Sequence, residues 1–260
     1  MNSFEHTRVG IIIPARLDST RLSKKLLIDV GGIPMIEHVR RRALLNSFRV
    51  PVVVASGDQE ILNLIKSYGG NALRTFDNHE NGLSRVGEAD KTLNWSRYIV
   101  LQGDEILVDP KDLDEMIRLN IDDSEDSAFN MVTSIKTEGQ LINASVVKCV
   151  LNQLDFIQFV FRQTPLTASI SHQLVNVYKI CGLFSVERKY LNKLISTDNT
   201  PISHIESIEQ LKMLELGFPL RAFVSNSDVP SVNLREDLEE VLKILETDLY
   251  QQELFNTIFG

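Results

Sequence analysis

The sequence has little of what several protein classes require. Its 260 residues include two cysteines, Cys149 and Cys181, whose separation fits no metal-binding or redox motif, so we expect two buried thiols. No apolar run approaches the roughly 18 residues of a membrane-spanning helix, and no signal-peptide pattern opens the chain. These absences predict a cytoplasmic protein with no membrane partner.

Positive charge is also in short supply. Lys and Arg together number 27 against 35 Asp and Glu, which gives a net charge of −8. An acidic body of this kind argues against nucleic acid as a partner, and any polyanion site has to be a local basic spot. Hydrophobic residues at 43% and charged residues at 24% are ordinary for a globular chain.

The first half of the chain alternates short apolar runs with amphipathic segments. We expect strands over 9–13, 50–55, 71–75 and 98–101, and helices over 34–46, 59–68, 84–93 and 110–120. Asp58 is placed to cap the second of these helices. Strand–helix alternation predicts an α/β fold with a mostly parallel sheet and helices on both faces.

The second half changes character. Strands are expected over 131–135, 146–151, 157–161 and 175–186 without long helices between them, which indicates an antiparallel extension or lid. Amphipathic spacing predicts single helices over 205–216 and 234–255. Because no linker interrupts the chain, we expect one domain over 1–260, with a β-rich subdomain inserted at about 122–186.

A loop rich in positive charge follows the first strand. Arg16, Arg21, Lys24 and Lys25 stand there against one carboxylate, Asp18. In open α/β sheets ligands bind beyond the carboxyl ends of the strands, so these cations are placed to neutralise a polyphosphate. A solvated basic surface loop explains the charges equally well.

A Gln-Gly-Asp-Glu turn over 102–105 ends the strand at 98–101. A carboxylate at that position, Asp104, suits Mg2+, which prefers oxygen ligands and phosphate oxygens. Read in isolation, the turn is more typical of a solvated or capping turn than of a metal site.

Ordered motifs from Val9 to about Val241 together resemble the CMP-Kdo synthetase family, the 3-deoxy-manno-octulosonate cytidylyltransferases. The segment 14–26 resembles "PAR…STRLPGKPL", 32–39 "GKPMIxHV", 79–85 "HxSGTxR", 102–106 "VQGDEP", 161–165 "FSRxxIP" and 200–211 "SPLEHIExLEQLR". The resemblance implies a Rossmann-like sheet with a smaller β-rich lid or dimerisation subdomain, and a homodimer. It implies Mg2+-dependent reaction of CTP with an acidic sugar, giving CMP-sugar and pyrophosphate for surface polysaccharide synthesis.

The resemblance also assigns roles to residues of this chain. It implies catalytic roles for Arg16, Lys25 and Asp104, and it places Mg2+ on Asp104 and on the residue at position 233. The nucleotide-binding set that it implies is Ala15, Arg16, Lys25, His79, Gly82 and Arg85, and the sugar-binding set is Gln102, Arg162, Glu209 and Gln210.

Three departures from the family pattern concern loop shape and substrate contacts. Ser23-Lys24 replaces Pro-Gly beside Lys25, which favours a different loop shape. Leu83 replaces a Thr expected to contact the nucleotide, and Ile180 replaces a His expected beside the sugar. Each exchange removes a polar group, so each favours a different substituent on the ligand.

The fourth departure concerns the metal. Asn233 occupies the place of the family's second metal-binding Asp, and its amide is a weaker ligand for Mg2+. Asn233 also fits an N-cap of the last helix with Glu236 as its capping partner. Asp228 could replace the missing carboxylate only if the loop folds differently.

Three interpretations stay open. The first is an active cytidylyltransferase for Kdo or a relative. The second is the same chemistry on another acidic sugar or nucleotide, which Leu83 and Ile180 favour. The third is a relative that binds without turnover, which Asn233 favours.

Overall fold

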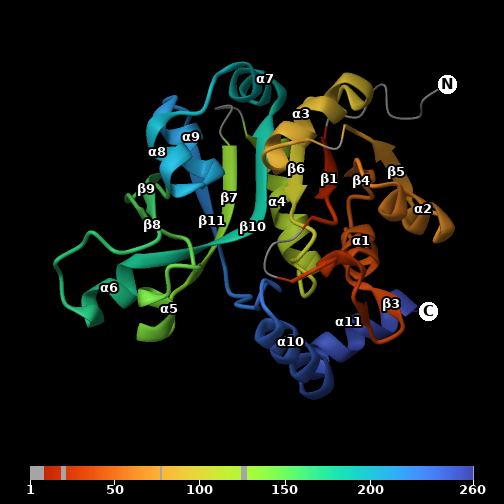
Figure 1. Ribbon diagram of the computed structural model, residues 1–260. Coiled ribbons are helices and arrows are strands. Elements are labelled where there is room, and N and C mark those ends of the chain that lie inside the picture. Colours follow the sequence, from red (N-terminus) through yellow and green to blue (C-terminus); the bar gives the residue numbers. More distant parts are fainter. Residues whose placement is uncertain (1–8, 19–21, 77, 124–127, 260) are drawn as a thin grey trace.

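The computed structural model describes residues 9–18, 22–76, 78–123 and 128–259 (Figure 1). Arg21 of the basic loop therefore lies outside the described residues, as does part of the acidic segment near 122–126. In the ranges that are described, every helix is too short or too polar to cross a membrane.

A mixed sheet forms the centre of the described molecule. Its seven-strand path runs β11 (Leu220–Ser225), β7 (Ala128–Ser134), β10 (Val177–Glu187), β6 (Arg97–Leu101), β1 (Val9–Ala15), β4 (Val52–Ser56) and β5 (Asn71–Arg74). β10 is antiparallel to β6 and β7, whereas β1, β4, β5 and β6 pair in parallel, as do β7 and β11. The expected mostly parallel α/β sheet is confirmed.

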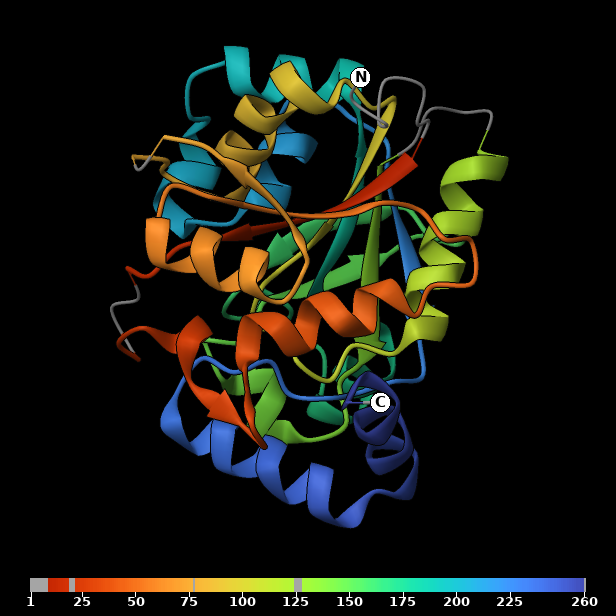
Figure 2. The same ribbon diagram turned by 90° about the vertical axis from the view of Figure 1, so that its right-hand side faces the viewer.

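Helices cover both faces of this sheet (Figures 1 and 2). One face carries α1 (Met35–Leu44), α2 (Gln59–Ser67), α4 (Pro110–Asp122) and α10 (Arg235–Thr247), and the other carries α3 (Gly82–Leu93), α7 (Arg188–Ser196) and α9 (Glu209–Glu215). The remaining elements are a 3-10 turn η1 (Lys25–Leu27), the hairpin β2 (Asp29–Val30) and β3 (Ile33–Pro34), and the helices α5 (Glu138–Ile142), α6 (Ile170–Asn176), α8 (Pro201–Glu206) and α11 (Leu249–Phe259).

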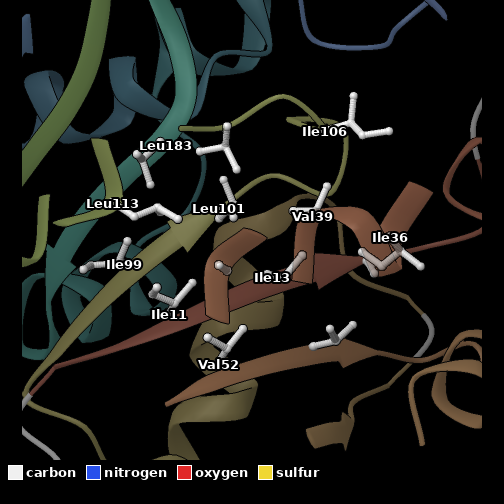
Figure 3. Packing of buried hydrophobic residues seen from close by; sticks show 14 of the residues in the cluster. Ile11, Ile13, Ile36, Val39, Val52, Ile99, Leu101, Ile106, Leu113 and Leu183 are labelled. Carbon is white, nitrogen blue, oxygen red and sulfur yellow. The ribbon is translucent and has the colours of Figure 1, made fainter. Parts of the chain in front are cut away.

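The central strand β1 is buried on both faces. Ile11 and Ile13 pack under α1 and α4, where Figure 3 shows them beside Val39 and Leu113. Ile12 points the other way and packs with Val86 of α3. A strand covered on both sides reads as a continuous apolar run, which is why the sequence locates it well.

β1 runs two residues beyond its expected end, through Pro14 to Ala15. Ile11 donates its N–H to Pro51 on the β4 side, so by alternation Pro14 faces the β6 side. The pairing of β1 with β6 has already ended there, at Ile12 and Val100. The missing N–H of Pro14 therefore costs no ladder hydrogen bond, and proline is tolerated inside this strand.

Two expected single helices are each divided. The segment 205–216 belongs to α8 and α9, because Ser207 between them adopts a left-handed conformation with φ 53°. The segment 234–255 belongs to α10 and α11, and Asp248 between them accepts the Gln251 N–H at 3.0 Å. Apolar spacing continues across both breaks, so the amphipathic pattern alone predicts one helix in each place.

β8 (Lys148–Leu151) and β9 (Ile157–Phe161) extend the sheet from β10. With α5 and α6 they project from one side of the molecule (Figure 1). β7 and β10, which also fall within the interval 122–186, are strands of the central sheet. The part that projects is therefore smaller than that interval.

The C-terminal helix α11 lies against the β2–β3 hairpin, and a glycine substitution in the hairpin tests how tightly the two pack. Gly31 has φ 67°, and a Cβ there would meet the ring of Phe255. Gly69 has φ 71° and an open surrounding. We expect Gly69→Ala to cost about 1 kcal/mol for the left-handed backbone, and Gly31→Ala to cost about 1–3 kcal/mol more for overpacking. Urea unfolding of both variants measures the difference, and equal losses would contradict the packing of Phe255.

Candidate active site

A polar cavity of about 250 Å³ opens at the carboxyl ends of β1 and β6. β4 and β5 lie on one side of β1 and β6 lies on the other, so this is the point where the strand order reverses. Ligands bind at such switch points in open α/β sheets because the flanking loops diverge there. The cavity is lined by Pro14, Ala15, Arg16, Asp18, Lys25, Leu26, His79, Asn81, Gly82, Arg85, Gln102, Gly103, Asp104 and Asn233.

The basic loop brings a cation and a carboxylate into contact. Lys25 opens η1, and its Nζ lies 2.7 Å from Asp104 Oδ2. Both side chains are partly buried, at 13% and 22% exposed. Arg16 is exposed at the rim of the same cavity. The two cations and the acid that the sequence singled out therefore share one cavity.

The exchange of Pro-Gly for Ser23-Lys24 leaves the loop backbone in a glycine-like shape. Lys24 has φ 48° and ψ 33°, in the left-handed region that glycine adopts most easily. The change of loop shape that this exchange favours stays a prediction. Its ammonium points away from the cavity and pairs with Glu60 at 2.8 Å.

Asp58 holds the basic loop, a role that sequence reasoning missed. It occupies the N-cap position of α2, but its carboxylate accepts the Leu17 N–H at 2.8 Å. The expectation that Asp58 caps α2 is therefore wrong with respect to its side chain. This hydrogen bond ties the loop to the start of α2, whereas the Lys24–Glu60 pair beside it is exposed, at 58% and 52%, and contributes little.

The N-terminus of α3 points into the cavity. Asn81 accepts the Ser84 N–H at 2.9 Å and so caps the helix. A Cβ on Gly82 would lie 3.3 Å from Pro14 Cγ and 3.4 Å from Gln102 Nε2, which shows how closely α3 approaches the ends of β1 and β6. A helix start favours an anion, and here the Glu209 carboxylate already occupies that position by accepting the Leu83 N–H at 3.1 Å.

Leu83 lies elsewhere than its motif position suggests. Its side chain is 5% exposed and packs in the core with Ile12 and Val86. Only its N–H faces the site, where it donates to Glu209 Oε1 at 3.1 Å. The prediction that Leu83 alters a ligand contact is therefore wrong, because helix geometry directs this side chain into the sheet.

His79 and Arg85 are held by neighbours on α3 and in the loop that follows β5. His79 Nε2 lies 2.6 Å from Glu88 Oε2, and Arg85 Nη1 donates to Thr75 Oγ1 at 2.6 Å and to the Phe76 carbonyl at 3.1 Å. Burial acts to raise the pKa of Glu88, but the Phe76 N–H and His79 lower it below its ordinary value. His79 thus has a carboxylate partner that fixes the direction of its ring.

The two acids of the Gln-Gly-Asp-Glu turn point in different directions. Asp104 lines the cavity, whereas Glu105 accepts the Gly182 N–H of β10 at 2.7 Å. Loss of solvent and the charge of Asp104 raise the pKa of Glu105 to about 7. A second hydrogen bond joins the turn to β10, because the Gln102 N–H donates to the Gly182 carbonyl at 2.8 Å. Sequence reasoning assigned no role to Glu105, which joins the turn to β10.

Asn233 lines the same cavity as Asp104 and lies on the segment that leads into α10. The adjacent Val232 donates its N–H to the Asp104 carbonyl at 3.1 Å. The predicted capping pair of Asn233 with Glu236 is wrong. Asp237 accepts the N–H groups of Asn233 and Leu234, both at 2.7 Å, because α10 begins at Arg235.

Asp228 does not stand in for the second metal carboxylate. Its oxygens pair with Lys179 at 2.8 Å and with Lys136 at 3.4 Å. Burial acts to raise the pKa of Asp228, but these two lysines lower it. Asp228 is therefore held by two lysines and lies outside the cavity lining.

The remaining sugar candidates lie beyond the described cavity lining. Arg162 donates to the carbonyls of Glu206 and Ala144 at 3.0 and 3.1 Å, and Gln210 donates to Asn130 Oδ1 at 2.8 Å. Glu209 faces the start of α3, and loss of solvent raises its pKa. Thus the structure gathers the nucleotide and metal candidates with Gln102, and leaves these three in a second layer.

Ile180, the third departure that the sequence shows, is half-buried and packs against the core cluster that contains Phe184. Its side chain is consistent with an apolar wall at the place where the family pattern has a His. Both cysteines are free and buried, as expected.

A switch-point cavity with clustered cations, a helix N-terminus and a strand-end carboxylate defines an α/β protein built to bind a nucleotide. A family model described as cytidylyltransferase matches residues 10–225. The chain belongs to the cytidylyltransferase family, and within it to the 3-deoxy-manno-octulosonate cytidylyltransferases. The homologue of that name from Chlorobium limicola is 33% identical over 238 residues, covering 90% of this chain and 96% of the relative.

Two further relatives support this assignment. The 3-deoxy-manno-octulosonate cytidylyltransferase of Chlorobium phaeobacteroides is also 33% identical over 238 residues, covering 90% of this chain and 96% of its own. A solved CMP:2-keto-3-deoxy-manno-octonic acid synthetase in complex with CTP superposes with a TM-score of 0.86 at 29% identity. It covers 94% of this chain and 100% of its own.

The environment of Glu105 gives a pH-dependent prediction. Its pKa of about 7 lies above the ordinary value of 4.5, so the folded state binds this proton more tightly than the unfolded state. The associated stability is present below pH 4.5 and is lost as pH rises through 7. Glu105→Gln stays neutral, so its stability relative to the parent protein should improve by on the order of 1–3 kcal/mol between pH 5 and pH 8. Urea unfolding across this range measures it, with exposed Glu240→Gln as control. A constant difference would contradict the raised pKa.

Proposed function

We propose that this cytidylyltransferase activates an acidic sugar, Kdo or a related ulosonic acid, with CTP to give CMP-sugar and pyrophosphate for surface polysaccharide synthesis. The observation that carries the proposal is the meeting of Arg16, Lys25 and Asp104 in one switch-point cavity. The names of the relatives, and the CTP in the solved synthetase complex, support the choice of nucleotide and sugar.

The chemistry asks the protein mainly to position two reactants and to neutralise charge. The anomeric hydroxyl of the sugar attacks the α-phosphate of CTP, and pyrophosphate leaves. In this proposal Arg16 and Lys25 bind the triphosphate, and Lys25 exchanges its present partner Asp104 for phosphate oxygens. Ala15 and Gly82 line the cavity with little or no side chain, so the nucleotide is able to approach the backbone closely there.

His79 and Arg85 complete the proposed nucleotide site. The Glu88 carboxylate orients His79, and Arg85 is 3% exposed with its guanidinium fixed by Thr75. Groups that are held before the ligand arrives lose little entropy on binding. We therefore assign both residues to holding the nucleoside part rather than to proton transfer.

The donor set of the cavity fits Mg2+. One carboxylate, Asp104, and one amide oxygen donor, Asn233, face the same space, and Mg2+ is commonly held by one or two carboxylates with waters and substrate phosphates. Among the described residues no group of three or more His, Cys, Asp and Glu side chains forms an all-protein cage. Mg2+ bound by Asp104 and Asn233 would supply charge neutralisation at the α-phosphate.

The sugar is proposed to bind on the β10 side of Gln102. Gly182 is required at this wall, since a Cβ there would lie 2.9 Å from Gln102 Cβ and 2.6 Å from Glu105 Oε1. Glu209 and Gln210 begin α9 just beyond it, and Arg162 reaches the same region from β9. Binding through Arg162 requires its guanidinium to leave the carbonyls that it now contacts.

A second candidate function keeps the chemistry and changes the sugar. The half-buried, apolar Ile180 favours a ligand with fewer polar substituents at that wall. Leu83 lends no support to a change of nucleotide, because it lies in the core. Asn233 remains the one feature that favours a relative without turnover.

We further propose that the whole chain acts as one nucleotidyltransferase domain and forms a homodimer. The projecting part around β8 and β9 carries exposed apolar side chains, including Ile142 at 65% and Val175 at 71% exposed. Such side chains are typical of a surface that another subunit covers. Light scattering tests the dimer against the 29.4 kDa mass of one chain. A cytoplasmic location stays a prediction.

The decisive test is pyrophosphate release with Mg2+, using each of the four nucleoside triphosphates against a panel of acidic sugars that includes Kdo. We expect release with CTP and one sugar. Lys25→Ala should lower kcat on the order of 10²–10³-fold, since it removes one fixed cation from the developing charge. Lys24→Ala is the matched control, because its ammonium pairs with Glu60 outside the cavity. Near-normal turnover by Lys25→Ala would refute the role of Lys25, and silence across the panel would favour a binding-only relative.

Asn233 generates a separate prediction. Asn233→Asp should bind the divalent cation more tightly, because a carboxylate is a stronger Mg2+ ligand than an amide. We expect a several-fold lower Mg2+ concentration for half-maximal rate and a matching gain in Mn2+ affinity in the presence of CTP, measured by water-proton relaxation. If rate, Mg2+ requirement and Mn2+ affinity all stayed as in the parent protein, Asn233 would have no part in metal binding.

A further inference from the structure

A group of charged side chains, Lys136, Lys179 and Asp228, lies outside the cavity lining. Lys179 extends from β10 and places its Nζ 2.8 Å from Asp228 Oδ1 and 3.4 Å from the Val229 carbonyl. The side chains of Lys179 and Asp228 are 18% and 9% exposed. Lys136 reaches the other oxygen of Asp228 at 3.4 Å, but its side chain is 60% exposed. The two lysines thus share one partner and differ in burial.

The acid that Lys179 binds belongs to the segment that carries Asn233. This segment, residues 226–234, leads from β11 to α10. It is anchored a second time where the Val232 N–H donates to the Asp104 carbonyl at 3.1 Å, with the Val232 side chain fully buried. Asn233, the next residue, lines the cavity. The segment is therefore fixed at Asp228 by Lys179 and at Val232 by the Asp104 turn.

Lys179 also acts on Glu105, the second acid of the turn over 102–105. Glu105 accepts the N–H of Gly182, which lies on the same strand as Lys179. Among the described residues, the charged groups near Lys179 are thus Asp228, which it shares with Lys136, and Glu105, on which Asp104 and Lys25 also act. A single partly buried cation thus faces acids from both pieces of chain that shape the metal side of the cavity.

We infer that Lys179 is a positioning residue for nucleotidyl transfer. By binding Asp228 and the Val229 carbonyl, it fixes the segment 228–233 so that Asn233 lines the cavity together with Asp104. The inference rests on the proposed function, and it adds a residue outside the cavity on which the alignment of the metal ligands depends. A long lysine suits this task because its ammonium donates to a carboxylate and a carbonyl at once.

The experiment compares Lys179→Met with Lys136→Met in the full-length protein. Lys136→Met removes the exposed partner of the same carboxylate and serves as the matched control, since exposed ion pairs contribute little. We expect Lys179→Met to lower kcat on the order of 10–100-fold, because small misplacements of catalytic groups cost that much. The Mg2+ concentration for half-maximal rate should rise several-fold while KM for CTP stays within about two-fold, and Lys179→Arg should restore part of both.

Hydrogen exchange supplies a readout that does not need turnover. The Val232 and Asn233 amides should exchange faster in Lys179→Met than in the parent protein and in Lys136→Met. Because an unpaired Asp228 could unfold the variant, the double variant Lys179→Met with Asp228→Asn removes both charges together and should show the same faster exchange. Mn2+ affinity in the presence of CTP, measured by water-proton relaxation, should fall in parallel.

The outcomes separate the two proposals. Unchanged exchange at Val232 in both Lys179 variants, or faster exchange with unchanged kcat and Mg2+ dependence, would overturn the role of Lys179. If the parent protein released no pyrophosphate with any sugar, the proposed function would fail. Hydrogen exchange and Mn2+ affinity would then test the role of Lys179 without turnover. Faster amide exchange together with weaker Mn2+ binding in Lys179→Met supports positioning of the metal ligands. Unchanged Mn2+ affinity overturns it.

Discussion

The parallel pairing of β1 with β4 on one side and β6 on the other is the constraint on which the rest of the structure depends. It buries β1 on both faces, which requires the apolar run Val9–Ile13 and helices above and below. It also makes the chain leave β1 and β6 in diverging directions, and the cavity opens between those exits. Pro14 fits this arrangement because β1 outlasts its pairing with β6, so the strand carries Ala15 and Arg16 forward to the site.

Charge pairing then shapes the cavity inside an acidic protein. Lys25 contacts Asp104, and His79 contacts Glu88, so two of the candidate ligand-binding groups already have a partner of opposite charge. Outside the cavity lining Lys179 pairs with Asp228, and its charge also acts on Glu105. A triphosphate with its metal ion carries both negative and positive charge. It is therefore able to replace each partner of a pair such as Lys25 and Asp104 with a group of the same sign. Cations without such partners would repel one another in the empty cavity. The same network fixes Asp104 from several sides and so limits its freedom before any ligand binds.

Much of the fold was readable because its elements are locally encoded. Continuous apolar runs marked β1, β4 and β6, and Pro110 marked the start of α4. The breaks at Ser207 and Asp248 escaped prediction, since the apolar spacing runs on across both and the left-handed residue or local cap that divides each helix leaves it unchanged. Family resemblance located the cavity residues, yet it could not tell that Leu83 turns into the core, because the direction of a side chain depends on where the helix packs.

The sequence by itself determined the alternation of strands and helices, the cation-rich loop after β1 and the carboxylate at the end of β6, because each depends on neighbouring residues and on strand direction. Only the tertiary structure decided which side chains meet. It joined Asp58 to Leu17, Glu105 to Gly182 and Lys179 to Asp228, and it left Arg162 and Gln210 outside the cavity lining. These contacts link residues that are 41, 77 and 49 positions apart in the sequence. Contacts over such long separations follow from sheet order and packing rather than from any local pattern.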